Sequence, residues 1–363
     1  MSNVVFILGA GASRQCGAPL MSDFLDVASD LLRSNAVQEM RVEFEKVFSA
    51  IGALQSVHSK AQLDLNNIES IFTVLELGRI IQRVPGLSST DIVETIAALK
   101  KLIVKTLEVT MKFPTRGRSI GVPQPYEAFG KMLDYLSTEA FPAQTTAVIS
   151  FNYDIAADMA IYKVGLGPDY IIDNPASRRS NVPLLKLHGS LNWATEKGSQ
   201  NIRPLHLESY FQHYQYNGFG EERSSTRVPI GSQLVEYFTR YASIDVETEP
   251  VIVPPTWNKA DYHSALSDVW AAAAKHLSEA EQIFILGYSL PETDSFFRHL
   301  YALGCVGSAP LRRIAVFNPD DSGTTDRRFK ALLGPGAVAR YEYHAMTFQS
   351  AIDHIKQLFP KRN

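Results

Sequence analysis

Cysteine is nearly absent from this 363-residue chain, which contains only Cys16 and Cys305. Two cysteines argue against a disulfide framework and against a four-cysteine zinc site. An excess of charge of one sign is also lacking, because the formal net charge is -3 and no long basic run occurs. We therefore expect no bound metal and no direct nucleic-acid binding as the main activity.

Long hydrophobic runs are missing as well. No apolar stretch approaches the roughly 20 residues that span a bilayer. The first residues, Met1 to Val5, carry no basic segment followed by a cleavable apolar stretch, and we interpret them as the start of a buried strand. We find no internal repeat and no low-complexity tract. A cytoplasmic protein without membrane contact is the expectation from these absences.

The chain does contain short apolar runs, each followed by polar residues or glycine, and several of them precede a helical pattern. Such runs are typical of strands buried on both faces of a parallel sheet. The fold class that this alternation predicts is α/β, a Rossmann-like, doubly wound, mostly parallel sheet within one domain spanning 1–363. The expected strands are 3–8, 147–151, 184–187, 282–286, 314–317 and, less regular, 341–343.

The spacing of the expected strands is uneven. More than a hundred mostly helical residues separate the first two, so we expect a helical insertion or lobe over 22–140. Within it, Asn66 or Asn67 is a plausible N-cap for a helix with one apolar face, and 91–111 is a second amphipathic helix. A stretch over 194–250 rich in Tyr, Ser and Gly predicts an irregular segment that covers the site.

The first expected strand ends in a glycine-rich turn, Gly9-Ala10-Gly11-Ala12-Ser13. Glycines allow a phosphate to approach the backbone, and a following helix would offer free N–H groups. The dinucleotide fingerprint G-x-G-x-x-G is incomplete, because Arg14 stands at the third glycine position. A tight strand-to-helix turn without a ligand explains this motif alone equally well.

Ligand-competent side chains also follow the next two expected strands. Asn152 and Asp154 come after the second strand, where open α/β sheets bind ligands. The alternative is that both residues cap the next helix. His188 follows the third strand and is suited to act as a general base near neutral pH, although a single histidine is more often structural.

The fourth and fifth strands end in Gly287-Tyr288-Ser289 and in Asn318. Ser289 with Glu292 three residues later has the pattern of a capping box, so helix punctuation explains part of this motif. Asn318 suits an adenosine ribose, and a turn explains it equally simply. Five strand ends with small or polar residues, all expected at one edge of one sheet, are more informative together than any one of them.

In order and type, these motifs resemble the Sir2 (sirtuin) superfamily, and more narrowly the bacterial Sir2-like NAD⁺-consuming effectors of anti-phage defence. The resemblance spans residues 4 to about 320. The matching pieces are Gly9–Ser13 with Gly17-Ala18-Pro19, then Phe151-Asn152-Tyr153-Asp154, Leu187-His188-Gly189-Ser190, Pro254-Pro255-Thr256-Trp257-Asn258-Lys259, Gly287-Tyr288-Ser289-Leu290-Pro291, and Asn318.

The chain departs from the deacylating sirtuins in two places. It lacks the two Cys-x-x-Cys pairs of their zinc module, and it has Asp23-Phe24-Leu25 where they carry an Asp-Phe-Arg run. These departures argue against peptide deacylation and leave NAD⁺ hydrolysis open.

The resemblance implies that NAD⁺ is the substrate and that Asn152 and His188 form the catalytic pair, with Asp154 orienting its neighbours. It implies a set of residues that hold the dinucleotide: Gly9, Ala10, Gly11, Ser13, Pro19, Gly287, Tyr288, Ser289 and Asn318. Cleavage of the nicotinamide–ribose bond passes through an oxocarbenium-like transition state, as in glycoside cleavage.

On this resemblance we expect an NAD⁺ glycohydrolase acting as a regulated effector of anti-phage defence. We expect a homo-oligomer and a separately encoded partner, such as a HerA-like ATPase, an Argonaute-like protein, a nucleotide-binding regulator or a phage protein. One alternative is a non-catalytic sensor of NAD⁺ or ADP-ribose, and another is a protein ADP-ribosyltransferase or deacylase. An ordinary oxidoreductase fits least, because the third glycine is absent.

Overall fold

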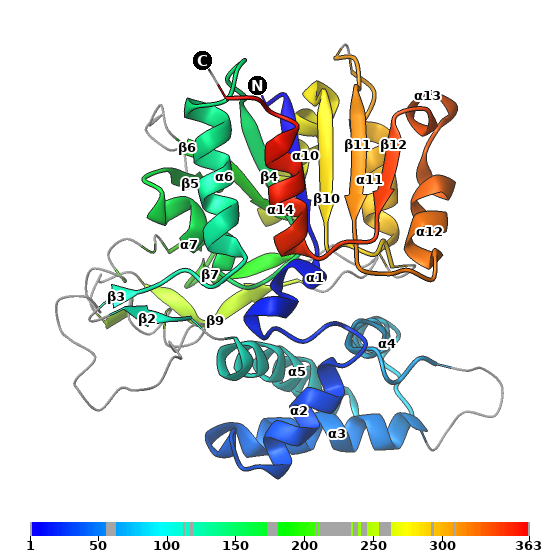
Figure 1. Ribbon diagram of the computed structural model, residues 1–363. Coiled ribbons are helices and arrows are strands. Elements are labelled where there is room, and N and C mark those ends of the chain that lie inside the picture. Colours follow the sequence, from blue (N-terminus) through cyan, green and yellow to red (C-terminus); the bar gives the residue numbers. More distant parts are fainter. Residues whose placement is uncertain are drawn as a thin grey trace.

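A computed structural model gives the fold of most of the chain (Figure 1). The residues that it describes are 2–55, 63–111, 113–116, 119–172, 181–199, 201–205, 207, 210, 234, 239–240, 245–253, 263–291, 294–307 and 309–361.

The central feature is a seven-stranded sheet in which all neighbouring strands are parallel. The α/β, doubly wound fold class is therefore confirmed, and so are all six strands expected from the sequence. In spatial order the strands are β12 (Tyr341–His344), β11 (Arg313–Phe317), β10 (Gln282–Leu286), β1 (Val4–Leu8), β4 (Thr146–Ser150), β6 (Asn181–Lys186) and β5 (Gly167–Asp169).

The strands are uniformly apolar because helices cover both faces of the sheet. Every residue of β1 and of β4 is buried. In Figure 1, α6 (Tyr126–Thr138) and α14 (Phe348–Gln357) lie on one face, and α10 (His263–Glu279) and α11 (Ser295–Gly304) lie on the other. Burial on both faces removes the polar–apolar alternation of a half-exposed strand, and this explains the continuous apolar runs of the sequence.

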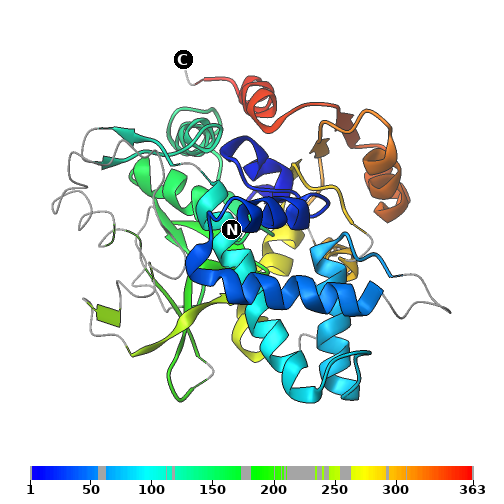
Figure 2. The same cartoon turned by 90° about the horizontal axis from the view of Figure 1, so that it is seen from below.

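Helices α2 to α5 lie between β1 and β4 and confirm the helical insertion. They lie beyond the carboxyl ends of the strands in Figure 1, and in the view from below they lie in front of the sheet (Figure 2). Asn67 caps α4, as expected, and Ser88 and Asp91 form a capping box on α5. Their bounds are Phe24–Arg33 for α2, Arg41–Gln55 for α3, Ile68–Ile81 for α4 and Ser89–Thr110 for α5.

Two small sheets are also present, one of them partly within 194–250, where the composition predicts loops or short strands on the surface, and the edge strand β5 was not expected from the sequence. β7 (Gly189–Glu196) pairs in antiparallel fashion with β8 (Ile202–Pro204) and β9 (Val246–Ile252), and β2 (Thr115–Arg116) pairs with β3 (Ser119–Ile120). The main-sheet strand β6 therefore continues into a second sheet rather than into a helix. β5 is short and contains a proline, a composition that gives no strand signal.

The remaining elements are short helices and turns that connect the strands and the longer helices. They are α1 (Ala10–Ser13), two 3₁₀ turns (Arg14–Cys16 and Gln38–Met40), α7 (Ala156–Lys163), α12 (Thr324–Leu332) and α13 (Pro335–Val338). Within the described ranges, no helix is long and apolar enough to cross a membrane.

The proposed boundaries of the lobe (22–140) and of the cover segment (194–250) stay predictions. Helix α6 belongs to the sheet layers, where it packs against α7 and α14, although it falls inside the 22–140 range. Most of 194–250 lies outside the described residues, and so do the whole motif 254–259 and Glu292.

Candidate functional site

A cavity of about 770 Å³ lies at the carboxyl ends of the parallel strands, between the sheet and the helices of the insertion. The chain first adds strands on one side of β1 (β4, then β5 and β6) and later on the other side (β10, β11 and β12). The strand order therefore reverses between β1 and β10. A reversal of this kind opens a crevice beyond the strand ends, where open α/β sheets bind ligands.

The structure brings the site residues expected from five different strand ends to this one cavity. All of them except Gly9 line it: Ala10, Gly11, Ser13, Pro19, Asn152, Asp154, His188, Gly287, Tyr288, Ser289 and Asn318. Their convergence follows from the topology, because each stands directly after a parallel strand or in the first turn after β1.

The glycines of the first turn are required for a contact that the sequence did not suggest. A Cβ on Gly9 would lie 2.5 Å from the Tyr288 Cα, and one on Gly11 would lie 2.8 Å from the Gly287 carbonyl oxygen. Gly287 itself has a φ of +63°, and a Cβ there would lie 2.2 Å from the Ala12 nitrogen. These glycines let the turn after β1 and the turn after β10 pack backbone against backbone.

This packing also uses most of the N–H groups of the first turn. Gly9 donates to the Leu286 carbonyl, Gly11 donates to the Gly287 carbonyl at 2.8 Å, and Ala12 donates to the Gly9 carbonyl. Of the four amides from Gly9 to Ala12, only that of Ala10 donates to no described residue. These four can therefore offer one backbone donor to an anion, fewer than the sequence motif suggested.

Asn152 is held by its side-chain amide at the centre of a polar cluster. Its Nδ2 donates to the Gly9 carbonyl at 2.9 Å and to the Ser13 Oγ at 3.1 Å, with a longer contact of 3.3 Å to the Tyr126 hydroxyl. Its backbone N–H donates to the Ser150 Oγ. Because Nδ2 is directed inward, Oδ1 is the amide atom that can meet a ligand, and it can only accept hydrogen bonds.

The directions of the hydrogen bonds in this cluster follow from the number of hydrogens available. Ser13 has one hydroxyl hydrogen and donates it to Asp154 Oδ2 at 2.7 Å. Tyr126 Oη, 2.9 Å from the Ser13 Oγ, must then be the donor to it. Burial and the nearby Asp154 charge raise the pKa of Tyr126 well above its usual value, so this hydroxyl keeps its proton.

Asp154 lines the cavity and also caps the next helix, so both alternatives that the sequence left open apply to its position. Its Oδ1 accepts a hydrogen bond from the Ala156 N–H at the start of α7, and its Oδ2 accepts one from Ser13. Burial raises the pKa of Asp154, and the nearby Lys186 charge opposes that rise. The carboxyl group therefore fixes the start of α7 and the Ser13 hydroxyl at the same time.

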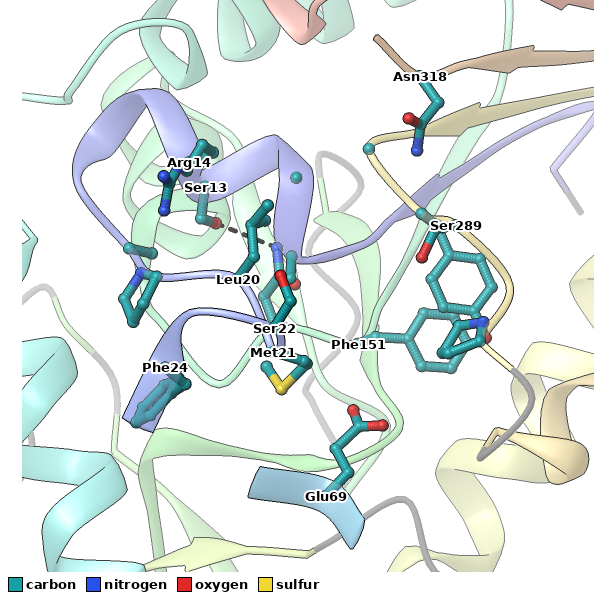
Figure 3. Close-up of a pocket in the computed structure, with 18 of the residues that line it drawn as sticks. Ser13, Arg14, Leu20, Met21, Ser22, Phe24, Glu69, Phe151, Ser289 and Asn318 are labelled. Carbon is teal, nitrogen blue, oxygen red and sulfur yellow. Dashed lines mark hydrogen bonds between the residues drawn. The ribbon is translucent and has the colours of Figure 1, made fainter. Parts of the chain in front are cut away.

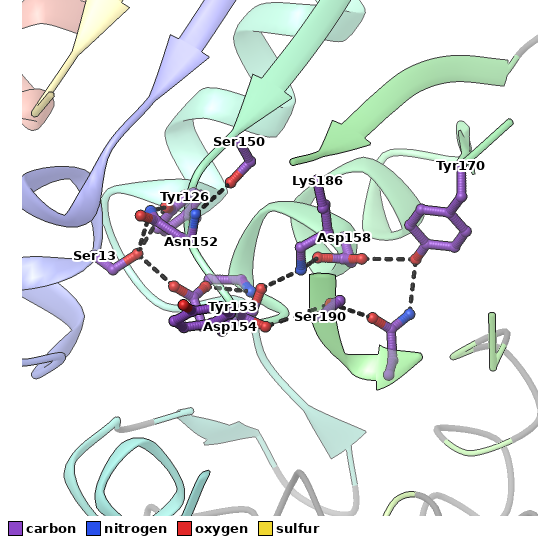
Figure 4. A network of polar contacts seen from close by, with 12 residues as sticks. Ser13, Tyr126, Ser150, Asn152, Tyr153, Asp154, Asp158, Tyr170, Lys186 and Ser190 are labelled. Atoms are coloured by element: carbon purple, nitrogen blue, oxygen red, sulfur yellow. Dashed lines mark hydrogen bonds and ion pairs between the residues drawn. The ribbon is translucent and has the colours of Figure 1, made fainter. Parts of the chain in front are cut away.

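Behind Asp154 lies a buried ion pair that sequence reasoning missed (Figure 4). The Lys186 Nζ lies 3.0 Å from Asp158 Oδ2, and both side chains are 0% exposed. The same Nζ donates to the backbone carbonyl of Asp154. Tyr170 donates to Asp158 Oδ1 at 2.6 Å. A lysine within the apolar run 184–187 was the available signal, because a charge in a buried strand needs a partner.

His188 stands where β6 ends and β7 begins, with a side chain that is 4% exposed. Phe151 meets its ring edge-on with centroids 5.2 Å apart, and Tyr153 lies 6.3 Å away. The next residue, Gly189, has a φ of +84°, and a Cβ there would lie 2.1 Å from the Val251 carbonyl oxygen. The glycine is therefore needed for the bend that directs the chain from one sheet into the other.

The turn after β10 corrects one expectation. Ser289 does not cap a helix, because α11 begins at Ser295 and its N-cap is Asp294, which accepts a hydrogen bond from the Phe297 N–H. Ser289 instead lines the cavity. Tyr288 stacks on Phe151 at 4.4 Å and donates to Asp294 Oδ2 at 2.6 Å.

The wall opposite the strand ends comes from the loop after α1 and from the insertion, and no motif in the sequence predicted it. Figure 3 shows Leu20, Met21 and Ser22 crossing the cavity, with the Glu69 carboxylate directed towards it. Burial is the main cause of the raised pKa values of Tyr153 and Tyr288, and the Glu69 charge adds to the rise in both cases. The negative charge of Glu69 therefore disfavours ionisation of both of these cavity tyrosines.

Comparison with known proteins gives matches among solved structures only. No family model matches the chain, and no curated protein matches it. The matching structures include a Sir2 homologue mutant with 2′-O-acetyl ADP-ribose (13% identity, 98% of this chain and 90% of that chain, TM-score 0.43). They also include a Sir2 homolog–NAD complex (14% identity, 98% and 88%, TM-score 0.41). These ligands belong to those proteins, and the chemistry of this cavity rests on its own residues.

Proposed function

We propose that this protein is a Sir2-like NAD⁺ glycohydrolase that cleaves NAD⁺ to nicotinamide and ADP-ribose in the cavity at the carboxyl edge of the sheet. The observation that supports this most directly is the meeting of Asn152 and His188 in one cavity with the turn after β1. An acceptor oxygen and an imidazole beside a glycine turn suit a reaction that needs a held ribose and an activated water.

The reaction is a hydrolysis at the C1′ atom of the nicotinamide ribose. The C1′–N bond breaks, and its electron pair goes to the pyridinium nitrogen, so nicotinamide leaves as a neutral molecule without needing a proton. The ribose becomes an oxocarbenium-like cation. A water oxygen then bonds to C1′, and the proton that the water loses goes to a base and from there to solvent.

In this scheme Asn152 and His188 have different tasks. Asn152 Oδ1 accepts a hydrogen bond from a ribose hydroxyl or from the attacking water, because Nδ2 is already held by Gly9 and Ser13. His188 accepts the proton of the water or of a ribose hydroxyl. Asp154 acts through Ser13, whose hydroxyl it fixes. Asp154 is thus a positioning residue.

We further propose that the enzyme is a regulated effector of anti-phage defence that acts by depleting NAD⁺. An unrestrained NADase would exhaust the NAD⁺ of its own cell, so this function requires control. Oligomer assembly, the 194–250 segment or a separately encoded partner protein are the means we expect. The insertion supplies one wall of the cavity, through Leu107 and the residues at the start of α4, and movement of this wall would alter access to the cavity.

The test is incubation of the purified protein with NAD⁺, with and without the products of neighbouring genes, while nicotinamide and ADP-ribose are measured. We expect nicotinamide and ADP-ribose in equal amounts, and no turnover by Asn152→Ala or His188→Ala with the fold retained. His299→Ala is the matched control, because His299 is exposed and does not line the cavity. It should keep wild-type activity.

Two other outcomes point to other functions. Binding of NAD⁺ or ADP-ribose without turnover under every condition would identify a sensor. Transfer of labelled ADP-ribose from NAD⁺ onto protein, or acyl-group removal from a peptide, would identify a transferase or deacylase. Full activity in both folded variants would refute the roles of Asn152 and His188.

A further inference from the structure

A guanidinium group that has no counter-ion among the described residues lines the cavity. Arg328 lies on α12, which follows β11, and its side chain is half-buried. Within the described part of the chain, Arg328 makes no ion pair and no hydrogen bond. The adjacent Arg327 differs, because it is exposed and bonds to the Ser322 carbonyl and the Thr324 hydroxyl.

The other guanidinium group of the cavity lining is already neutralised. Arg14 forms an ion pair with Asp23 Oδ2, whose carboxyl group also accepts the Leu20 N–H. Arg328 is therefore the arginine of this lining whose charge is left for a ligand. A half-buried guanidinium is always charged and suits the bidentate binding of a phosphate group.

The carboxylates of the cavity are distributed differently. Asp154 follows β4, Asp294 caps α11 beside Tyr288, and Asp64 and Glu69 lie on the wall formed by the insertion. None of these four belongs to β11 or α12. A ligand that carries a cation at one end and anionic groups towards the other end matches this distribution, and the nicotinamide end of NAD⁺ is such a cation.

The position of Arg328 along the sheet indicates which part of a dinucleotide it meets. β11 lies two strands from β1, and this distance is about 10 Å at the usual strand spacing. A pyrophosphate beside the turn after β1 would place the adenosine ribose near Ser289 and Asn318, next to α12. Arg328 would then lie beside the 2′ position of that ribose.

Among the described residues of the lining, no carboxylate at this end takes the place of the one that excludes a 2′-phosphate in NAD⁺-selective Rossmann sites. Such sites use an acidic side chain to accept the ribose 2′-hydroxyl, whereas an arginine accommodates a 2′-phosphate. The first acid after Asn318 is Asp320, which does not line the cavity. Its carboxylate is engaged by the Ser322 and Thr325 N–H groups and by the Ser322 hydroxyl.

We propose that the site accepts the 2′-phosphorylated dinucleotide NADP⁺ as well as NAD⁺, with Arg328 binding the 2′-phosphate. This proposal rests on the proposed function, in which the nicotinamide ribose lies at Asn152 and His188. It adds a substrate and a residue that determines specificity, without changing the bond that is cleaved.

The test is calorimetric titration with adenosine 2′,5′-bisphosphate and with 5′-AMP, which differ only in the 2′-phosphate. We expect wild-type protein to bind the bisphosphate about tenfold to a hundredfold more tightly than 5′-AMP. Arg328→Gln should lose this preference and keep its affinity for 5′-AMP. Arg327→Gln is the matched control on the same helix and should keep the preference.

Two results would overturn the proposal. One is the absence of a preference in wild-type protein. The other is an equal loss of affinity for both nucleotides in Arg328→Gln, because the guanidinium would then bind the 5′-phosphate. NAD⁺ cleavage by wild-type protein without a preference for the bisphosphate refutes only the role of Arg328. The expected preference without any NAD⁺ or NADP⁺ cleavage refutes only the hydrolase function.

Discussion

The inward direction of the Asn152 amide predicts an unusual pH dependence for the Asn152→Asp variant. The substitution keeps the shape of the side chain and replaces the Nδ2 donor by an oxygen that faces the Gly9 carbonyl at 2.9 Å. As a carboxylate it removes one donor from the Gly9 carbonyl and one from the Ser13 Oγ, which keep their hydrogen bonds from Ala12 and Tyr126, and it places a negative oxygen against both acceptors. Only the protonated acid provides both a donor for Gly9 and an acceptor oxygen for the cavity.

The size of the effect follows from the two hydrogen bonds that are lost. A hydrogen bond contributes about 0.5–1.5 kcal/mol, and the buried carboxylate oxygen that faces two acceptors adds a further penalty, so the total cost is about 3 kcal/mol. At about 2 °C per kcal/mol for a large domain, the melting temperature of the variant should fall by about 6 °C at pH 8. Displacement of the side chain should lower NAD⁺ cleavage by about a hundredfold at that pH.

The sign of the pH dependence is fixed by proton linkage. The lost donors and the buried Asp154 carboxyl raise the pKa of the new carboxyl above that of an ordinary Asp. At a pH between the pKa of ordinary Asp in the unfolded chain and the higher pKa of the new carboxyl in the folded variant, the folded variant holds a proton that the unfolded chain has released. The stability of the variant relative to wild type therefore falls as the pH rises through this interval and is best at low pH.

The assay is thermal unfolding and NAD⁺ cleavage of wild type, Asn152→Asp and Asn152→Ala from pH 5 to pH 8.5. Asn152→Asp should regain stability and activity towards pH 5, whereas Asn152→Ala, which has nothing to titrate at this position, should stay inactive throughout. A melting temperature and activity equal to wild type at pH 8 would refute the inward amide. So would a stability deficit of the same size at every pH.

Two further substitutions test other parts of the site. Lys186→Met leaves Asp158 buried without its cation, so the variant should lose about 3–5 kcal/mol of stability and melt at least about 6 °C lower. The control is Lys330→Met, which removes an exposed lysine from its ion pair with Asp326 and should change the melting temperature little. Equal melting temperatures for the two variants would show that the buried pair is dispensable. Glu69→Gln should lower kcat/KM for NAD⁺ about tenfold in a steady-state assay, because a carboxylate of the cavity lining stabilises the ribosyl cation, and a tenfold effect corresponds to about 1.4 kcal/mol. Asp64→Asn removes an exposed carboxylate from the same lining and should have less effect. A larger effect of Asp64→Asn would show that the charge of Glu69 does not act on the reacting ribose.

The sequence by itself determined the parallel sheet and the edge at which its site lies. The runs in β1, β4, β10 and β11 are apolar throughout, because both faces of these strands are covered, and this pattern depends only on the residues within each run. Parallel strands place their carboxyl ends at one edge, so polar residues after several such strands had to converge.

Only the tertiary structure decided what the residues at that edge contact. Gly9 and Gly11 proved to pack against Gly287, because two turns distant in sequence cross above neighbouring strands. Ser289 faces the cavity and Asp294 caps the helix, since both residue types can serve as caps and the path of the backbone selects between them.

The same limit applies to residues that come from elements remote from the strand ends. Glu69 and Arg328 reach the cavity from two different helices, and no local pattern in the sequence distinguishes them from surface residues of those helices. Periodicity and strand ends are local properties, so they predicted the sheet edge and the turns. The partner of each buried polar group depends on which distant segments meet it, and the packing of the whole chain determines that.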